Sequence, residues 1–121
     1  MAYPVDESRV RDAEALLGRA LPAALRARLL RDNGGEVECD GAAWRLFAVW
    51  DPTDRRTARK TASHVVAETR AAAAWRGFPP GAIAIAEDGS GDLLVVPAGT
   101  DTIAIWQHET GELVPADDLV L

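Results

Sequence analysis

The sequence predicts an α+β fold, in which N-terminal helices precede a mainly antiparallel β-sheet and pack against it. Apolar residues recur at helical spacing in the first third of the chain. After residue 81, short apolar runs alternate with glycine-containing turns, which is typical of strands joined by hairpins. The regular alternation of strand and helix that builds a parallel sheet is missing. A chain of 121 residues then predicts a single domain, residues 1–121.

Two helices are expected before residue 35. The first covers residues 6–17, because Asp6 can cap its first amides and Gly18 suits the left-handed conformation that ends a helix. The second opens at Leu21-Pro22, since the fixed φ of proline fits a first turn.

Leucines four residues apart predict the buried face of this second helix, and Asn33-Gly34-Gly35 ends it because Asn and Gly tolerate positive φ. The leucines are Leu21, Leu25 and Leu29. The arginines expected to point elsewhere are Arg26, Arg28 and Arg31.

Beyond these glycines the apolar period changes to two. Residues 36–39 alternate polar and apolar side chains as a short strand does, and Asp40-Gly41 makes a turn. Residues 44–50 are rich in aromatic and β-branched side chains and predict a second strand, which Asp51-Pro52 ends. One face of that strand would carry Trp44, Leu46, Ala48 and Trp50.

A further helix is expected from about residue 54 to 75, where Ala, Arg and Thr dominate, and the Gly and Pro residues of 77–81 stop it. Three strands follow near residues 82–86, 92–97 and 102–107. Residues 113–121 fit either a strand or a short helix.

Charge is distributed unevenly along the chain. Every Lys and Arg lies at or before Arg76, so the stretch from Gly81 to Leu121, with eight acidic residues, has a formal charge of −8. The remainder has 13 basic and 11 acidic residues, or +2. An acidic half repels nucleic acid and anionic lipid and attracts a basic partner, although a solvated surface explains it equally well.

The turn from Glu87 to Asp92 is the most informative segment. Asp88-Gly89-Ser90-Gly91-Asp92 resembles the start of a calcium loop, but Leu93 and Gly99 occupy the positions where an EF-hand needs Gly and Glu. Phosphate binding is disfavoured because a strand follows the loop and its flanks are acidic. A hairpin between two apolar strands is the preferred interpretation, and neither a cofactor nor a metal is expected.

Catalytic residues are not marked by any motif. His64 and His108 are the only histidines, neither has a companion ligand at helical or turn spacing, and G-x-S-x-G does not occur. Both are expected at the surface. Cys39 is the only cysteine, which excludes an internal disulfide and favours a small buried side chain in a reducing cytoplasm.

Four tryptophans, at positions 44, 50, 75 and 106, are expected mainly in the core, with an interface role as the alternative. Trp106 alternates with Ile103 and Ile105, so it should lie on the opposite face of the sheet.

Several segments, in this order, resemble the signatures of the SUKH superfamily, the group of Smi/Knr-type domains. They are Ala13–Gly18, Leu21-Pro22, Leu29–Gly35, Ile85–Asp92 and Ile105–Glu109, and the likeness covers about residues 6–38 and 83–118. The residues that match family signatures are Leu21, Pro22, Asn33, Gly34, Gly35, Asp88, Gly89, Gly91 and Asp92. Residues 55–76 match no signature and are a candidate variable region.

The resemblance implies an α+β domain and a function. Bacterial members of this kind are regarded as immunity proteins that bind and neutralise toxins, many of them nucleases, and they bring no catalytic residues to carry over. The leading hypothesis is a non-enzymatic cytoplasmic protein that occludes a basic toxin domain, without nucleic acid or membrane as partner. The candidate partner-binding residues are Glu36, Glu38, Asp40, Trp44, Trp50, Glu87, Asp88, Asp92 and Trp106.

Two rival hypotheses remain. A regulatory or scaffold module of the same fold would bind a host protein and have no toxin gene beside it. A small enzyme would use His64 or His108 with an acidic partner. The N-terminus lacks the basic and apolar segments of a secretory signal, and no apolar stretch approaches the roughly 20 residues of a membrane span.

Overall fold

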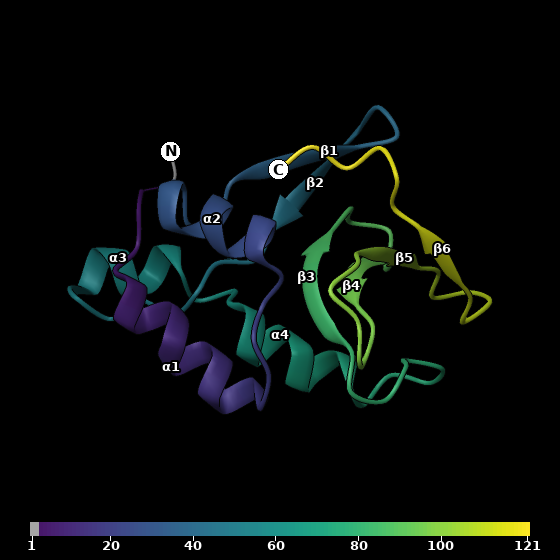
Figure 1. The fold of residues 1–121 in the computed structure, drawn as a ribbon, viewed down its shortest axis with the longest axis horizontal. Coiled ribbons are helices and arrows are strands. Elements are labelled where there is room, and N and C mark those ends of the chain that lie inside the picture. Colours follow the sequence, from purple (N-terminus) through teal and green to yellow (C-terminus); the bar gives the residue numbers. More distant parts are fainter. Residues whose placement is uncertain (1–2) are drawn as a thin grey trace.

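The computed structural model describes residues 3–121 and shows helices gathered on one side of a curled sheet (Figure 1). The α+β prediction is confirmed. The helices are α1 (Glu7–Leu17), α2 (Ala23–Arg31), α3 (Arg55–Lys60) and α4 (Val65–Ala72). The strands are β1 (Glu36–Cys39), β2 (Ala42–Leu46), β3 (Ile83–Glu87), β4 (Leu93–Val96), β5 (Ala104–Trp106) and β6 (Leu113–Pro115).

The six strands form one antiparallel sheet in sequence order, so each strand pairs with the next along the chain. A register shift between Ala84 and Ala86 interrupts the β3–β4 pairing. After β6 the chain runs back to β1 (Figure 1), where the Val120 amide donates to the Glu38 carbonyl at 2.8 Å. The open choice for residues 113–121 is thereby resolved as a short strand followed by this bridge.

Helix α1 begins and ends where its capping residues predict, whereas α2 ends at Arg31, with Asp32 extended, before the Asn33-Gly34-Gly35 turn that was expected to end it. Asp6 accepts a hydrogen bond from the Ser8 amide at 2.9 Å, and Gly18 takes φ 76° at the end of α1. Pro22 immediately precedes α2. Leu25 and Leu29 are fully buried, as their spacing predicts.

Arg28 does not point away from the core, and the prediction for it was wrong. Its guanidinium is buried and donates to the carbonyls of Asp32, Gly34 and Glu36. The end of α2 and the glycine turn leave backbone carbonyls without helical hydrogen-bond donors. The planar guanidinium of Arg28, with five N–H donors, bonds to several of these carbonyls at once.

The helix predicted from residue 54 to 75 is divided into α3 and α4, and the single-helix prediction was wrong. The Thr61 hydroxyl donates to the Thr57 carbonyl at 2.9 Å and accepts the Asp51 amide at 3.0 Å. His64 then starts α4, accepting the Ala67 amide at its Nδ1 at 3.3 Å. Side chains that bond to nearby backbone favour helix ends over helix interiors, which explains the break.

The strand predicted over residues 44–50 ends at Leu46. The Phe47 amide still donates to the Ile85 carbonyl at 2.8 Å, but the segment then leaves the sheet. Both Phe47 and Ala48 are buried, so the segment is covered on both sides, whereas Trp50 is 41% exposed.

The core lies where α4 packs between α1 and the sheet (Figure 1). The Ala84 amide of β3 donates to the Thr69 hydroxyl of α4 at 2.9 Å, which fixes the helix on the strand. The three strands predicted near residues 82–107 are confirmed as β3, β4 and β5, and β3 and β4 are almost wholly buried. Within residues 3–121, no helix has both the length and the apolar character needed to cross a bilayer.

Candidate functional site

The topology gathers three acidic turns at one end of the sheet. Neighbouring strands are antiparallel, so the β1–β2, β3–β4 and β5–β6 connections emerge at the same end. These connections contain no Lys or Arg, and we call them the acidic turns. Their acidic residues are Asp40, Asp88, Asp92, Glu109 and Glu112.

The C-terminal segment adds two more carboxylates to this end. The bridge between Val120 and Glu38 brings Asp117 and Asp118 beside Asp40, which itself has φ 53°. A hydrogen-bonding contact with Asp118 raises the pKa of Asp40, and burial and repulsion from Asp118 and Asp117 add to the effect. Within residues 3–121 no Lys, Arg or His forms an ion pair with these three carboxylates, so this surface is complementary to a positive partner.

Removing one of these charges should change the pH dependence of folding. Because the Asp40 pKa is raised in the folded protein, folding is favoured when Asp40 is protonated, and stability is lost as pH rises from 3.8, the ordinary Asp value, through the folded pKa. We therefore expect Asp118→Asn to raise the melting temperature at pH 7 and to have little effect below pH 3.

Thermal unfolding from pH 3 to 8 would measure this gain, and NMR titration would show the Asp40 pKa returning toward 3.8. Glu109→Gln removes the same charge from the acidic turn between β5 and β6 and is the matched control. An Asp40 pKa that stays unchanged in the Asp118 variant would contradict the coupling.

Glu36, Arg45 and Glu87 form a row of charges across β1, β2 and β3. The register places Glu36 opposite Arg45 and Arg45 opposite Glu87. The Arg45 guanidinium lies 3.0 Å from the Glu87 carboxylate in a half-exposed ion pair. This row is therefore partly neutralised, whereas Glu38 is exposed and has no cation within 4.0 Å among residues 3–121.

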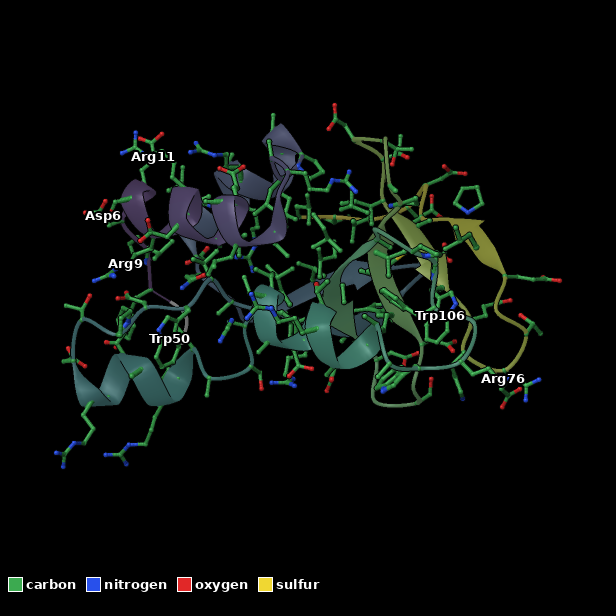
Figure 2. The ribbon with its side chains drawn as sticks, turned by 90° about the horizontal axis from the view of Figure 1, so that it is seen from below. Asp6, Arg9, Arg11, Trp50, Arg76 and Trp106 are labelled. Carbon is green, nitrogen blue, oxygen red and sulfur yellow. The ribbon has the colours of Figure 1, made fainter. Side chains whose placement is uncertain are left out.

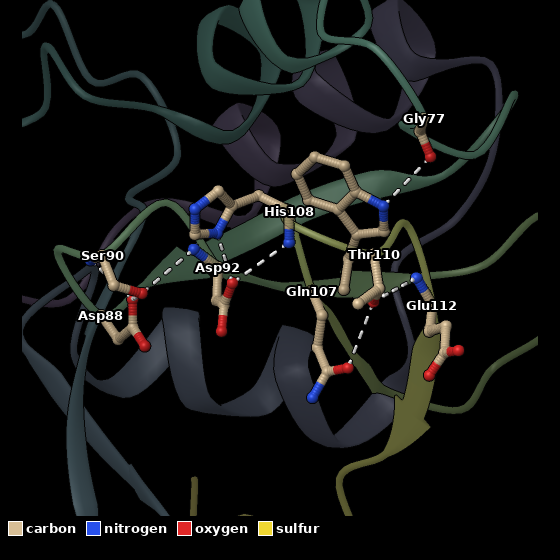
Figure 3. A network of polar contacts seen from close by, with 9 residues as sticks. Gly77, Asp88, Ser90, Asp92, Gln107, His108, Thr110 and Glu112 are labelled. Atoms are coloured by element: carbon tan, nitrogen blue, oxygen red, sulfur yellow. Dashed lines mark hydrogen bonds and ion pairs between the residues drawn. The ribbon is translucent and has the colours of Figure 1, made fainter.

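The β3–β4 turn is a hairpin, as the sequence predicts, and its own side chains hold it (Figure 3). Asp88 accepts hydrogen bonds from the Ser90 amide at 2.9 Å and the Ser90 hydroxyl at 2.7 Å. Gly89 and Gly91 have φ 88° and 110°, which favour glycine. The described residues, 3–121, contain no group of three or more His, Cys, Asp or Glu side chains placed to hold a metal ion.

His108 has an acidic partner that the sequence does not reveal. Its Nδ1 lies 2.6 Å from an Asp92 carboxylate oxygen, which also accepts the His108 amide at 3.1 Å (Figure 3). The ring lies against Gly91, where an added Cβ would approach it to 3.0 Å. Asp92 and His108 thus join the second and third acidic turns. Only the β4–β5 register, with Leu93 opposite Trp106, would have indicated this pair beforehand.

His64 is half-buried and caps the first turn of α4. Burial, and next the charge of Arg70, lower the pKa of His64, which favours the neutral ring that accepts the Ala67 amide. Cys39 is 1% exposed, as its strand position predicts, and burial raises the pKa of its thiol.

The tryptophans divide between core and surface differently from the prediction. Trp44 and Trp106 are 5% and 1% exposed, so neither offers a partner an accessible anchor. The indole N–H of Trp44 has no hydrogen-bond partner among residues 3–121. Trp50 and Trp75, expected in the core, are 41% and 46% exposed. Trp50 lies beside α3, away from Trp106 (Figure 2), so it is not next to the acidic turns.

Sequence reasoning overlooked the apolar edge beside the acidic turns and part of their charge. Leu113 and Val114 of β6, the outermost strand, are 42% and 37% exposed, and Val120 is 64% exposed. The acids at this end of the sheet that were not predicted as candidates are Glu109 and Glu112 of the turns and Asp117 and Asp118 of the C-terminal segment. The −8 segment contains all four, but only a strand order could show which acids share one end.

The signature residues lie around the ends of α2 and in the β3–β4 turn. Leu21 and Pro22 are buried at the start of α2, where Glu14 accepts the Leu21 amide at 2.7 Å. Asn33 is buried and bonds to both backbone groups of Val49.

A model of the SMI1 / KNR4 family (SUKH-1) matches residues 4–118. Comparison with curated proteins found no match for the chain.

Proposed function

The chain belongs to the SMI1 / KNR4 family (SUKH-1), and we propose that it is a non-enzymatic immunity protein that neutralises a bacterial toxin by covering its basic active surface. Its expected place of action is the cytoplasm. The observation that carries the proposal is the set of acidic turns at one end of the sheet, which Asp117 and Asp118 of the C-terminal segment extend.

A nuclease toxin needs cationic side chains where it binds phosphate, so an acidic surface is complementary to its active site. Opposite charges accelerate encounter and select the partner. A cationic toxin would also remove the repulsion between Asp40 and Asp118, which makes binding more favourable than for isolated acids.

Apolar contacts would hold the complex after encounter. Leu113 and Val114 follow directly after Glu112 on the edge strand β6, so exposed apolar surface adjoins an acidic turn. These residues and Val120 replace Trp44 and Trp106 as candidate anchors, because the two indoles are buried. A polar rim around apolar anchors is the usual anatomy of a protein interface.

The direct test is co-expression with the toxins encoded beside this chain. Survival of the host together with a stable complex on gel filtration is the expected result. If every neighbouring toxin still kills, the immunity function is excluded. A host protein captured in the absence of any neighbouring toxin gene would favour the scaffold alternative.

Charge reversal tests which surface binds. We expect Glu109→Lys combined with Asp118→Lys to weaken toxin binding at least tenfold, because both residues belong to the acidic end. The matched control is Asp12→Lys combined with Asp101→Lys, which changes net charge equally. Asp101 lies in the β4–β5 connection, at the other end of the sheet, and Asp12 lies on α1.

Titration calorimetry at two salt concentrations measures the toxin affinity of both double variants and shows whether they differ. Equal losses for both pairs would mean that only net charge matters, and no loss for the first pair would exclude the acidic turns as the binding surface.

A further inference from the structure

A groove of about 530 Å³ lies at the end of β1 and β2 opposite their acidic turn. The volume falls within the range of small-molecule sites, roughly 300–1,000 Å³. The Asn33-Gly34-Gly35 turn and the end of β2 form one side, and α3 with the segment that follows it forms the other. Figure 2 shows α3 at one extremity of the molecule, so the groove is separate from the proposed toxin surface.

The cations of α3 at this groove lack acidic partners. Arg59 and Lys60 line it, and neither has a carboxylate within 4.0 Å among residues 3–121. The Lys60 ammonium lies 4.6 Å from the centre of the Tyr3 ring, which also lines the groove. A cation above an aromatic ring holds its charge near the groove without neutralising it.

The groove also contains two carboxylates, Asp51 and Glu36. Asp51 is buried and accepts hydrogen bonds from the amide and hydroxyl of Thr53. Glu36 is opposite Arg45 in the strand register, but the Arg45 guanidinium forms its ion pair with Glu87. Arg59 and Lys60 outnumber Asp51 on the α3 side of the groove, which therefore has a net positive charge, and the Thr57 and Ser63 hydroxyls lie on the same side.

We propose that this groove binds a small phosphate ester, with the phosphate between Arg59 and Lys60 and the organic part against the Tyr3 ring. Two adjacent cations suit a dianionic phosphate better than a monoanionic carboxylate, and arginine's planar fork binds two phosphate oxygens at once. An aromatic wall favours a ligand that carries a flat ring. This site is independent of the acidic turns and would exist whether or not the partner is a toxin.

NMR titration of the whole chain with three ligands tests this assignment. Phenyl phosphate carries both the phosphate and the ring, inorganic phosphate carries the phosphate alone, and benzoate carries the ring with a carboxylate instead of a phosphate. Phenyl phosphate is expected to bind most tightly and to shift the amides of residues 33–36 and 57–63. Tyr3→Leu should remove the advantage of phenyl phosphate over inorganic phosphate. If phenyl phosphate does not saturate at millimolar concentration, the assignment is wrong.

Two double variants of α3 distinguish binding in the groove from general electrostatic attraction to the helix. Arg59→Gln combined with Lys60→Gln should weaken phenyl phosphate binding at least tenfold. Arg55→Gln combined with Arg56→Gln removes equal charge from α3 residues that do not line the groove and should change binding by less than twofold. Equal weakening by both pairs would overturn the proposal.

A Glu-rich peptide provides the last comparison. If it binds more tightly than phenyl phosphate and loses affinity with the Arg59 and Lys60 pair, the groove receives an acidic protein segment and the small-molecule assignment is wrong. Circular dichroism melts of each variant confirm that the chain remains folded.

Discussion

Replacing Trp106 by alanine is expected to lower the free energy of unfolding by about 3–5 kcal/mol, the range for a large aromatic removed from a packed core. The indole is 1% exposed, and its ring centroid lies 5.3 Å from that of Phe78 and 6.0 Å from that of Trp75. Its N–H also donates to the Gly77 carbonyl at 3.1 Å (Figure 3). The variant would leave a cavity and an unpaired carbonyl together.

Urea denaturation followed by circular dichroism measures the loss. Trp75→Ala removes the same side chain from the same aromatic cluster, but Trp75 is 46% exposed, so we expect a loss of about 1 kcal/mol or less. Trp106→Phe keeps most of the packing and should fall between the two. A Trp106→Ala variant within about 1 kcal/mol of the wild type would show that this cluster does not stabilise the sheet.

Trp106 also shows what the sequence can predict about packing and what it cannot. Alternation with Ile103 and Ile105 predicts the opposite sheet face, and both isoleucines are indeed only half-buried while Trp106 is covered. The cover comes from residues 75–78, which follow α4 and are distant in sequence. Periodicity carries no information about such a long-range contact, so Trp75 could not be distinguished from a core residue.

The sequence predicts a helix end well when a capping residue within the helix determines it. It predicts the end less well when hydrogen bonds to distant segments interrupt the helix. Asp6 and Gly18 act within their own helix, and the limits of α1 follow from them. The break between α3 and α4 depends on Thr61 bonding to Asp51 and on His64 lying beside Ala48. The first of these partners is ten residues away and the second sixteen, so helical spacing alone favoured one continuous helix.

The sequence predicts that the C-terminal third is acidic, but it does not predict that the acidic turns lie at one end of the sheet. Thirty-five residues of the chain precede Glu36, and nothing in their composition reveals the strand order that brings Asp40 to the same end as Asp88 and Glu109. A meander sheet places alternate turns together, and the returning C-terminal segment adds Asp118. Two of the three candidate tryptophans, Trp44 and Trp106, are buried, because aromatic residue type alone does not distinguish an interface anchor from a core residue.

Replacing Asn33 by alanine is expected to cost about 2–4 kcal/mol, because it leaves two buried backbone groups without partners. The Asn33 carboxamide accepts the Val49 amide at 2.7 Å and donates to the Val49 carbonyl at 2.9 Å, and Val49 is fully buried. This one side chain therefore joins the turn after α2 to the segment after β2. It explains in physical terms why Asn precedes Gly34-Gly35 in this signature.

Asn33→Asp separates the hydrogen bonds from the shape of the side chain. The new carboxylate can accept the Val49 amide, but it cannot donate to the Val49 carbonyl unless it is protonated. Burial and the facing carbonyl would raise its folded-state pKa above about 3.9, the ordinary value for Asp. The penalty relative to wild type should thus be small below pH 4 and grow as pH rises through the folded pKa.

The signature turn could stabilise the fold through the Val49 hydrogen bonds of Asn33 or through its glycines alone. Denaturation across pH 3–8 distinguishes these roles when wild type is compared with Asn33→Ala and Asn33→Asp. A pH-dependent penalty for the aspartate and a constant one for the alanine would establish that both Val49 bonds stabilise the fold. Equal, pH-independent losses would instead mean that the turn depends on its glycines alone. In the first case Asn33 is a fold determinant, which leaves the exposed acidic turns and the α3 groove as the surfaces through which this chain can differ in partner from others of its family.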